Sequence, residues 1–312
     1  MHWKDVLIGS GDHLYQLLGA SGRSVNLSSL KQESQSSFCR QILVFAAHPD
    51  DESIGCGLAI HTLAQQGYAV HVIFTTNGRG PRRLHRPATI RHLIRDRFDE
   101  AHKALTLLKV PIENIHCLGY PDAGLYRNTH RALRDVVRII RVVHPQFILT
   151  HGVEGGHIDH DVTSLLVQYA ALRVSGPTPV IEWAEYNDEY ALGSPYPVLF
   201  PAFCEGVNPS YAMDTHLAPS VKQQALKQYV GQKEPHLVMK QGERFRLADM
   251  VATQIFIDHF YSQATAKGAR YGPVLKRFLR RIPTSLERHH DISATALSWL
   301  SRVLPVKPSD LN

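Results

Sequence analysis

Two short stretches of the chain combine imidazole and carboxylate side chains at a spacing suited to holding a metal ion. The first, AHPDDE (47–52), places His48, Asp50 and Asp51 directly after the apolar run QILVFAA. Side chains three residues apart on a turn that enters a helix point the same way, so His48 and Asp51 can face one ion. Asp50 diverges from its neighbour and can face a water molecule on that ion. The second stretch, THGVEGGHIDHD (150–161), follows another apolar run.

The second stretch offers the residues that the first lacks. A catalytic zinc ion takes three protein ligands and keeps one position open. His157 and His160 are again three residues apart, so one can complete the ligand set while the other stands beside the open position. Asp159 or Asp161 can hold a histidine in one tautomer. Each stretch alone is also compatible with a polar turn that caps a helix, but the two together favour a metal-dependent hydrolase.

Alternating buried strands and helices must bring the two stretches together. This alternation predicts an α/β fold, a Rossmann-like and mostly parallel sheet with helices on both faces. Ligands of such sheets bind beyond the carboxyl ends of the strands, where both stretches lie. The predicted strands are 41–47, 68–76, 114–122, 146–152 and 179–187, and the predicted helices are 57–67, 94–108, 130–145 and 161–175.

The 312 residues, 44% hydrophobic and 20% charged, suffice for one sizeable core. We expect a single catalytic domain at 39–282, an N-terminal extension at 1–38 with a Ser-rich linker, and a C-terminal tail at 283–312. No run of about 18 apolar residues occurs, so we predict no integral membrane segment, and no secretory signal stands out. Four widely spaced cysteines without a CxxC pair indicate a cytoplasmic protein without a disulfide framework.

Basic residues gather in two stretches of a chain whose formal net charge is +6. These stretches are RGPRRLHRPATIRHLIRDR (79–97) and LKRFLRR (275–281). Such charge runs are usually solvated helix faces and loops, and we expect no nucleic-acid partner. The first stretch follows a predicted strand, so it can line the rim of the site and meet an anionic part of a substrate. The candidates for that contact are Arg82, Arg83 and Arg86. A homo-oligomer is left open.

On AHPDDE followed by GCG (55–57), and on THG…GHIDHD, the chain resembles the LmbE/PIG-L family of metal-dependent N-deacetylases. Weaker matches follow in family order over about residues 40–245, namely RFDE (97–100), LGYPDAGL (118–125) and KQQALKQYVGQ (222–232). The resemblance implies a Rossmann-like domain that holds Zn2+, although Fe2+ also suits the ligand set. It further implies a small-molecule substrate, an N-acetylated amino sugar such as an N-acetylglucosamine-type glycoside or conjugate.

The resemblance also implies roles for individual residues. It assigns three zinc ligands, His48, Asp51 and His160. It makes Asp50 the general base, His157 the residue that stabilises the oxyanion, and Asp159 the acid that supports His157. Arg97 and Asp122 are the expected substrate-binding residues, although a helical ion pair and a tight turn explain them equally well. The common HPDH motif of the family is HIDH here, which leaves the ligands intact.

The predicted activity is hydrolysis of an acetamide to a free amine and acetate. Two other functions remain open, an amidase acting on a thiol-sugar conjugate and a noncatalytic carbohydrate-binding protein of the same fold. An intact Asp50 argues against the binding protein, which needs no base. A dinucleotide site is disfavoured because GCG lacks the full GxGxxG pattern and an acidic cluster would repel a pyrophosphate. A two-metal phosphoesterase would need more ligands than the sequence offers.

Overall fold

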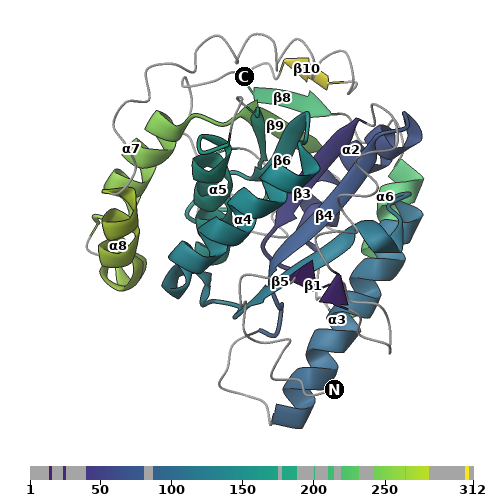
Figure 1. The fold of residues 1–312 in the computed structure, drawn as a ribbon, viewed down its shortest axis with the longest axis horizontal. Coiled ribbons are helices and arrows are strands. Elements are labelled where there is room, and N and C mark those ends of the chain that lie inside the picture. The colour runs from purple at the N-terminus through teal and green to yellow at the C-terminus, as the bar shows by residue number, and fades with distance from the viewer. Residues whose placement is uncertain are drawn as a thin grey trace.

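A ten-stranded mixed sheet forms the centre of the computed structural model (Figure 1). The structure describes residues 14–15, 24–25, 40–80, 87–174, 178–187, 200, 210–213, 219–231, 242–263, 265–280 and 306–308. The strands are β1 (Leu14–Tyr15), β2 (Ser24–Val25), β3 (Gln41–Ala46), β4 (Ala69–Thr76), β5 (Ile115–Tyr120), β6 (Phe147–His151), β7 (Val180–Trp183), β8 (Ser210–Met213), β9 (Glu243–Leu247) and β10 (Val306–Pro308). Their order in the sheet is β10-β8-β9-β7-β6-β3-β4-β5-β1-β2.

The middle of the sheet is parallel. Strand β3 pairs in parallel with β4 and β6, and β5 and β7 extend this arrangement on either side. The outer strands pair antiparallel. All residues of β3 are buried, as expected for a parallel strand covered on both faces. The predicted α/β fold with a mostly parallel sheet is therefore confirmed.

Helices cover both faces of the sheet (Figure 1). Side chains of β3 alternate between two apolar layers, with Leu43 and Phe45 in one and Ile42 and Val44 in the other. The first layer packs against α4 (Thr129–Val143), α5 (Ile158–Ala171), α7 (Met250–Phe260) and α8 (Ala266–Leu279). The second packs against α2 (Asp51–Gln65), α3 (Pro87–Leu107) and α6 (Pro219–Leu226). Two 3-10 turns, η2 (Ile112–Asn114) and η3 (Leu125–Arg127), complete the described elements.

Two helices begin earlier than the sequence predicts. Helix α2 begins at Asp51 instead of residue 57, and α5 begins at Ile158 instead of residue 161. Both metal-type clusters therefore lie in the first turn of a helix. The predicted extension 1–38 and tail 283–312 lie outside the described residues, apart from the short strands β1, β2 and β10 that join the sheet. Among the described helices, none combines the length and the apolar character that a membrane span requires.

Helix α2 is broken at Cys56, whose φ and ψ of −144° and 24° are not helical. A buried ion pair satisfies the backbone groups that the break leaves open. Glu243 accepts hydrogen bonds from the amides of Leu58 and the next residue, at 2.7 and 3.0 Å. Lys222 donates to the carbonyl of Ile54 and to Glu243. This arrangement lets the first turn of α2 take a direction of its own at the end of β3.

Candidate metal and active site

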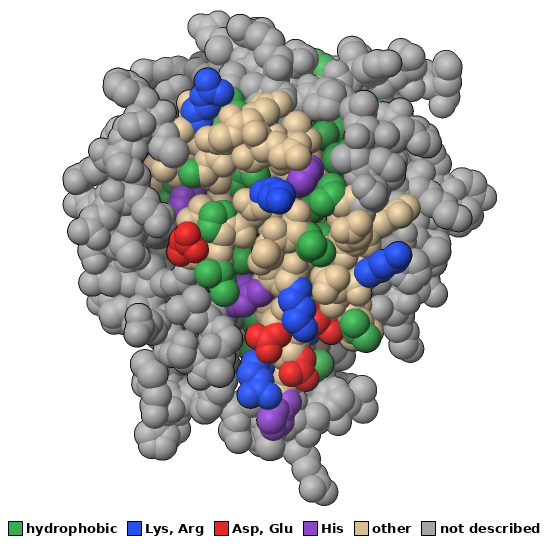
Figure 2. Space-filling model, turned by 90° about the vertical axis from the view of Figure 1, so that its right-hand side faces the viewer, with side chains coloured by type: hydrophobic (Ala, Val, Ile, Leu, Met, Phe, Trp, Pro, Cys, Tyr) green, Lys and Arg blue, Asp and Glu red, His purple; other side chains and the backbone are tan. Residues whose placement is uncertain are grey.

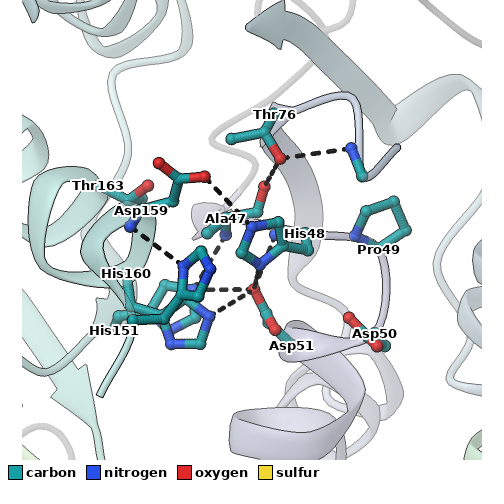
Figure 3. Close-up of polar contacts among 12 residues, drawn as sticks. Ala47, His48, Pro49, Asp50, Asp51, Thr76, His151, Asp159, His160 and Thr163 are labelled. Atoms are coloured by element: carbon teal, nitrogen blue, oxygen red, sulfur yellow. Dashed lines mark hydrogen bonds and ion pairs between the residues drawn. The ribbon is translucent and has the colours of Figure 1, made fainter. Parts of the chain in front are cut away.

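The two clusters predicted from the sequence meet beyond the carboxyl ends of β3 and β6 (Figure 3). Asp51 lies between the imidazoles of the two predicted histidine ligands. Its Oδ2 is 3.2 Å from Nδ1 of His48 and 3.3 Å from Nε2 of His160. The two rings are 5.3 Å apart between centroids, and all three side chains are buried. The chain folds so that residues more than 100 positions apart converge on one point.

These distances suit a divalent metal ion. Two atoms that each lie about 2.1 Å from a tetrahedral zinc ion are about 3.4 Å from one another. The two separations from Asp51 Oδ2, to His48 Nδ1 and to His160 Nε2, match that value. Nε2 of His160 is buried and has no hydrogen-bond partner among the described residues. The donor set and this unpaired nitrogen therefore fit a metal, and His48, Asp51 and His160 would hold it.

Two carboxylates set the orientation of the His48 ring. Its Nε2 lies 3.4 Å from Asp159 Oδ2 and 3.5 Å from Asp122 Oδ1. Burial favours the neutral ring, but these carboxylates and Asp51 outweigh it and raise the pKa of His48 well above its usual value. A carboxylate on one ring nitrogen leaves the other nitrogen to a metal. Nδ1 of His48 is thus presented beside Asp51.

Asp159 and Asp122 are therefore neighbours of His48 in the structure. Asp159 also accepts hydrogen bonds from the amides of Ala123 at 2.6 Å and Leu125 at 3.2 Å, which fix its carboxylate. Asp122 accepts one from the amide of Gly80 at 2.8 Å. The sequence analysis assigns Asp159 to His157 and Asp122 to the substrate. Both carboxylates contact the His48 ring. One potential ligand atom of each of His48, His157, Asp122 and Asp159 lies within 4.8 Å of the others, so the roles expected for Asp159 and Asp122 stay predictions.

His157 caps the N-terminus of α5. Its Nδ1 accepts a hydrogen bond from the amide of Asp159 at 3.2 Å, so the proton of the neutral ring sits on Nε2. Burial and two neighbouring histidines lower the pKa of His157 to about 3. The ring packs edge-on against His48, with 4.7 Å between centroids. A neutral His157 beside the ligand cluster can still donate a hydrogen bond through Nε2.

Asp50 occupies a strained backbone conformation, with φ of 138°. Such strain is costly for a residue with a side chain and persists where surrounding contacts enforce it. Here the amide of Asp50 donates to Glu52 at 3.1 Å. Glu52 in turn accepts hydrogen bonds from Ser53 and from the hydroxyl of Tyr229. The buried Glu52 network thus holds the turn that points Asp50 away from Asp51 (Figure 3).

Arg97 fixes the carboxylate of Asp50. Its Nη2 donates to Asp50 Oδ2 at 3.1 Å and to the carbonyl of Pro49 at 3.1 Å, while Nη1 donates to the carbonyl of Gly78 at 2.8 Å. Burial raises the pKa of Asp50 to about 8, and the positive charge of Arg97 opposes that rise. The sequence analysis gives Arg97 a substrate contact or a helical ion pair. In the structure its guanidinium contacts the predicted base and the backbone on either side of it, and a substrate contact stays a prediction.

Two residues of the site, His151 and Glu185, were not predicted from the sequence. The structure groups them with Asp51 and His160, with one potential ligand atom of each within 4.8 Å of the others. His151 is the last residue of β6, and Glu185 follows β7. Their positions at the carboxyl ends of adjacent parallel strands were a usable signal. Both residues follow apolar runs that indicated strands, and the polar residues at the ends of those runs were not considered as ligands.

Comparison with known proteins identifies the family. The sequence model of the PIG-L family, described as GlcNAc-PI de-N-acetylase, matches residues 43–171. A probable N-acetyl-alpha-D-glucosaminyl L-malate deacetylase 2 from Bacillus cereus is 30% identical over 166 residues, which cover 50% of this chain and 73% of that protein. The chain belongs to the PIG-L/LmbE family of N-deacetylases. The resemblance seen in its motifs is thereby confirmed.

Further comparisons extend over more of the deacetylase. A 1D-myo-inositol 2-acetamido-2-deoxy-alpha-D-glucopyranoside deacetylase from Thermobifida fusca is 26% identical over 284 residues, 75% of this chain and 96% of that protein. Two other relatives of that description match over about half of their own length. The N,N'-diacetylchitobiose deacetylase of Pyrococcus horikoshii has the same fold, with a TM-score of 0.54 at 19% identity over 72% of this chain and 90% of that one.

The basic stretch that the sequence analysis places at the rim is only partly described. Its described part lies on α3, where Arg95 and Arg97 alternate with Asp96 and Asp99. Figure 2 shows basic and acidic side chains intermixed on the side of the molecule that carries this helix. Arg95 and Asp96 are exposed, as expected for a solvated helix face, whereas the side chain of Arg97 is largely buried against Asp50. Arg82, Arg83 and Arg86 lie outside the described residues.

Proposed function

We propose that this deacetylase uses a zinc ion held by His48, Asp51 and His160 to remove the acetyl group from an N-acetylglucosamine-type glycoside or conjugate. The observation that carries the metal proposal is the convergence of the three ligand atoms at 3.2 and 3.3 Å around Asp51. The relatives named above act on N-acetylglucosamine derivatives, which supports the choice of sugar. Ferrous iron suits the same donors and is tested alongside zinc.

The chain's own residues supply the proton transfers. A bound zinc ion would provide Lewis acidity and lower the pKa of a water molecule towards about 7. Asp50 accepts the proton of the attacking water as the new C–O bond forms at the acetyl carbon. His157 donates a hydrogen bond from Nε2 to the oxyanion that develops on the carbonyl oxygen. Asp50 then returns its proton to the leaving nitrogen as the C–N bond breaks, which releases acetate and a free amine.

The experiment is a mass-spectrometric screen of N-acetylated sugars with the purified protein, scored by the loss of one acetyl group. The panel includes glucosaminyl conjugates of inositol and malate, chitobiose derivatives and thiol-sugar conjugates. Chelator should abolish turnover, and added zinc or ferrous iron should restore it. Turnover that survives complete metal removal would refute the metal proposal, and turnover of thiol-sugar amides alone would replace the proposed substrate.

Asp50→Asn separates an enzyme from a binding protein of the same fold. Removing a general base typically costs on the order of 10²–10⁴ in rate. We expect the variant to lose turnover by that factor while it retains zinc and binds substrate by calorimetry. Asp96→Asn, on the exposed face of α3, is the matched control and should keep full turnover. A variant at position 50 with wild-type turnover would exclude Asp50 as the base.

An anionic group on the substrate is a further part of the proposal. It is supported by the three arginines that follow β4 in the sequence, Arg82, Arg83 and Arg86. Replacing them together with Gln should raise the Michaelis constant for a phosphorylated N-acetyl sugar and weaken its dependence on salt. The constant for the uncharged sugar serves as the control. An equal change for both substrates would argue against an anionic contact.

A further inference from the structure

The residue that precedes the HPDDE turn is tied to the end of β6 by a histidine outside the proposed ligand set. The amide of Ala47 donates a hydrogen bond to Nε2 of His151 at 2.9 Å. The carbonyl of Ala47 accepts hydrogen bonds from the amide and the hydroxyl of Thr76, at 3.0 and 2.8 Å. Ala47 is thus held from both sides directly before His48. The position of the proposed ligand therefore depends on His151.

The same imidazole lies against the other two proposed ligands. The ring of His151 stacks on that of His160, with 4.0 Å between centroids and 23° between planes. Its Nε2 is 3.3 Å from Asp51 Oδ2. Because His151 and His160 come from β6 and α5, the stack fixes the plane of His160 against the sheet. One fully buried ring thus contacts Asp51 and His160 directly and is linked to His48 through the amide of Ala47.

A buried carboxylate and an indole fix His151 from behind. Its Nδ1 lies 3.2 Å from Glu185 Oε2, and that oxygen also accepts a hydrogen bond from the indole of Trp183 at 3.1 Å. The indole packs on the His151 ring at 4.6 Å between centroids. Gly55 at the break of α2 makes room for the indole, since a Cβ there would lie 2.1 Å from it. Tertiary packing therefore constrains the ring on all sides.

We propose that His151, backed by Glu185, is a positioning residue that holds the proposed metal ligands in place without itself binding the ion. An imidazole nitrogen has one in-plane lone pair, and the amide of Ala47 already occupies that of Nε2. The proton of the neutral ring then sits on Nδ1, on the side of Glu185. Nδ1 has no hydrogen-bond partner among the described residues, but it carries the proton of the neutral ring and lies 3.2 Å from Glu185 Oε2. Neither nitrogen therefore offers a free lone pair to the ion, although four potential ligand atoms lie close together. The inference rests on the metal site of the proposed function.

The test measures zinc affinity of the full chain by chelator competition. His151→Phe keeps a ring for the stack but removes the acceptor for Ala47, and losses of residues that orient metal ligands typically cost 10–100-fold in affinity. We expect a loss in that range. His151→Gln restores an acceptor and should recover part of it. His116→Phe, the same change at a buried histidine of β5, is the matched control and should bind zinc as the wild type does.

X-ray absorption of the zinc-loaded protein separates positioning from ligation. The wild type and His151→Gln should show the same number of imidazole ligands. One imidazole fewer in the variant, or unchanged affinity in His151→Phe, would overturn the inference. If His151→Phe does not fold, the zinc affinity of Glu185→Leu is measured in its place. Weaker zinc binding by that variant would support the inference, and wild-type binding would refute it. A wild type that binds no zinc would instead refute the proposed metal site itself.

Discussion

Arg97 provides a quantitative test of how the site prepares its base. The guanidinium lies 3.1 Å from Asp50 Oδ2, and both side chains are about nine-tenths buried, at 12% and 10% exposure. For unit charges about 4 Å apart, an effective dielectric constant of 20 gives an attraction of about 4 kcal/mol. That energy corresponds to about three pKa units. Loss of the charge must therefore raise the pKa of Asp50, which burial already raises to about 8.

The perturbation is Arg97→Met, which keeps much of the apolar volume and removes the charge. Because the ionised form of Asp50 is the base, its higher pKa should move the acid limb of kcat/KM to higher pH. We expect a displacement of roughly one to three units, since water entering the space would reduce the full Coulomb value. At pH 7 this displacement lowers kcat/KM by roughly 10- to 1,000-fold. The bound metal is the same in both proteins, so its effect cancels in the comparison.

The assay is the pH profile of kcat/KM with saturating metal, for the wild type, Arg97→Met and Arg95→Met. Arg95 lies exposed on the same helix and is the matched control, which should keep the wild-type profile. An acid limb that stays in place in Arg97→Met would refute the electrostatic argument. If the Michaelis constant rises while the acid limb does not move, Arg97 contacts the substrate, as the sequence analysis expects.

Two further predictions concern groups behind the site. His116→Leu should make the free energy of unfolding less sensitive to acid. Burial lowers the pKa of His116 to about 3, so below about pH 6.5 the histidine takes up a proton in the unfolded chain but not in the folded one. This proton uptake destabilises the folded wild type as the pH falls. At about 1.36 kcal/mol per pKa unit, the wild type should lose about 2–3 kcal/mol of unfolding free energy between pH 6.5 and 4.5, and the variant should keep this stability. Urea unfolding at the two pH values measures the difference. His92→Gln, at an exposed histidine, is the control and should lose as much stability as the wild type. Tyr229→Phe removes a hydrogen bond to Glu52, which holds the strained backbone of Asp50. The variant should therefore have a kcat about tenfold lower and the zinc affinity of the wild type. An unchanged kcat would refute the link between Tyr229 and Asp50.

Local sequence patterns predicted the elements that are buried on both faces. The runs at 41–47 and 146–152 became β3 and β6, because a fully apolar strand of that length has few other places in an α/β fold. The start of α2 was wrong for a physical reason. Glycines at 55 and 57 weaken helical propensity, and the break between them is satisfied by Lys222 and Glu243, which lie more than 160 residues away. No local pattern contains that ion pair.

The candidate site divides in the same way. Spacing and family resemblance named His48, Asp51 and His160, and the structure brings them together. The contacts around these three residues could not be predicted from spacing, because the contacts join residues at the ends of different strands. The carboxylate of Asp159 contacts His48 and two loop amides, and Arg97 contacts Asp50 beside the loop that follows β4. Spacing along the chain contains no information on these contacts, because tertiary packing forms them.

Several buried carboxylic acids lie close together in this site, and their charge determines which ligand the site can bind. Asp50, Asp51, Asp159 and Glu185 are all buried within the same group of contacts. Burial raises the pKa of Glu185, and the nearby negative charge of Asp51 raises it further. Carboxylates so close together are disfavoured as anions unless cations compensate them. Arg97 compensates Asp50, and Asp51 lies between the imidazoles of His48 and His160, where a divalent ion would be bound. Asp159 lies at the other nitrogen of His48, and Glu185 lies behind His151. The raised pKa of His48 shows that an imidazolium compensates part of this charge. A divalent ion bound by His48, Asp51 and His160 would add two positive charges at the same place, so it would stabilise the buried acids as well as complete the ligand set.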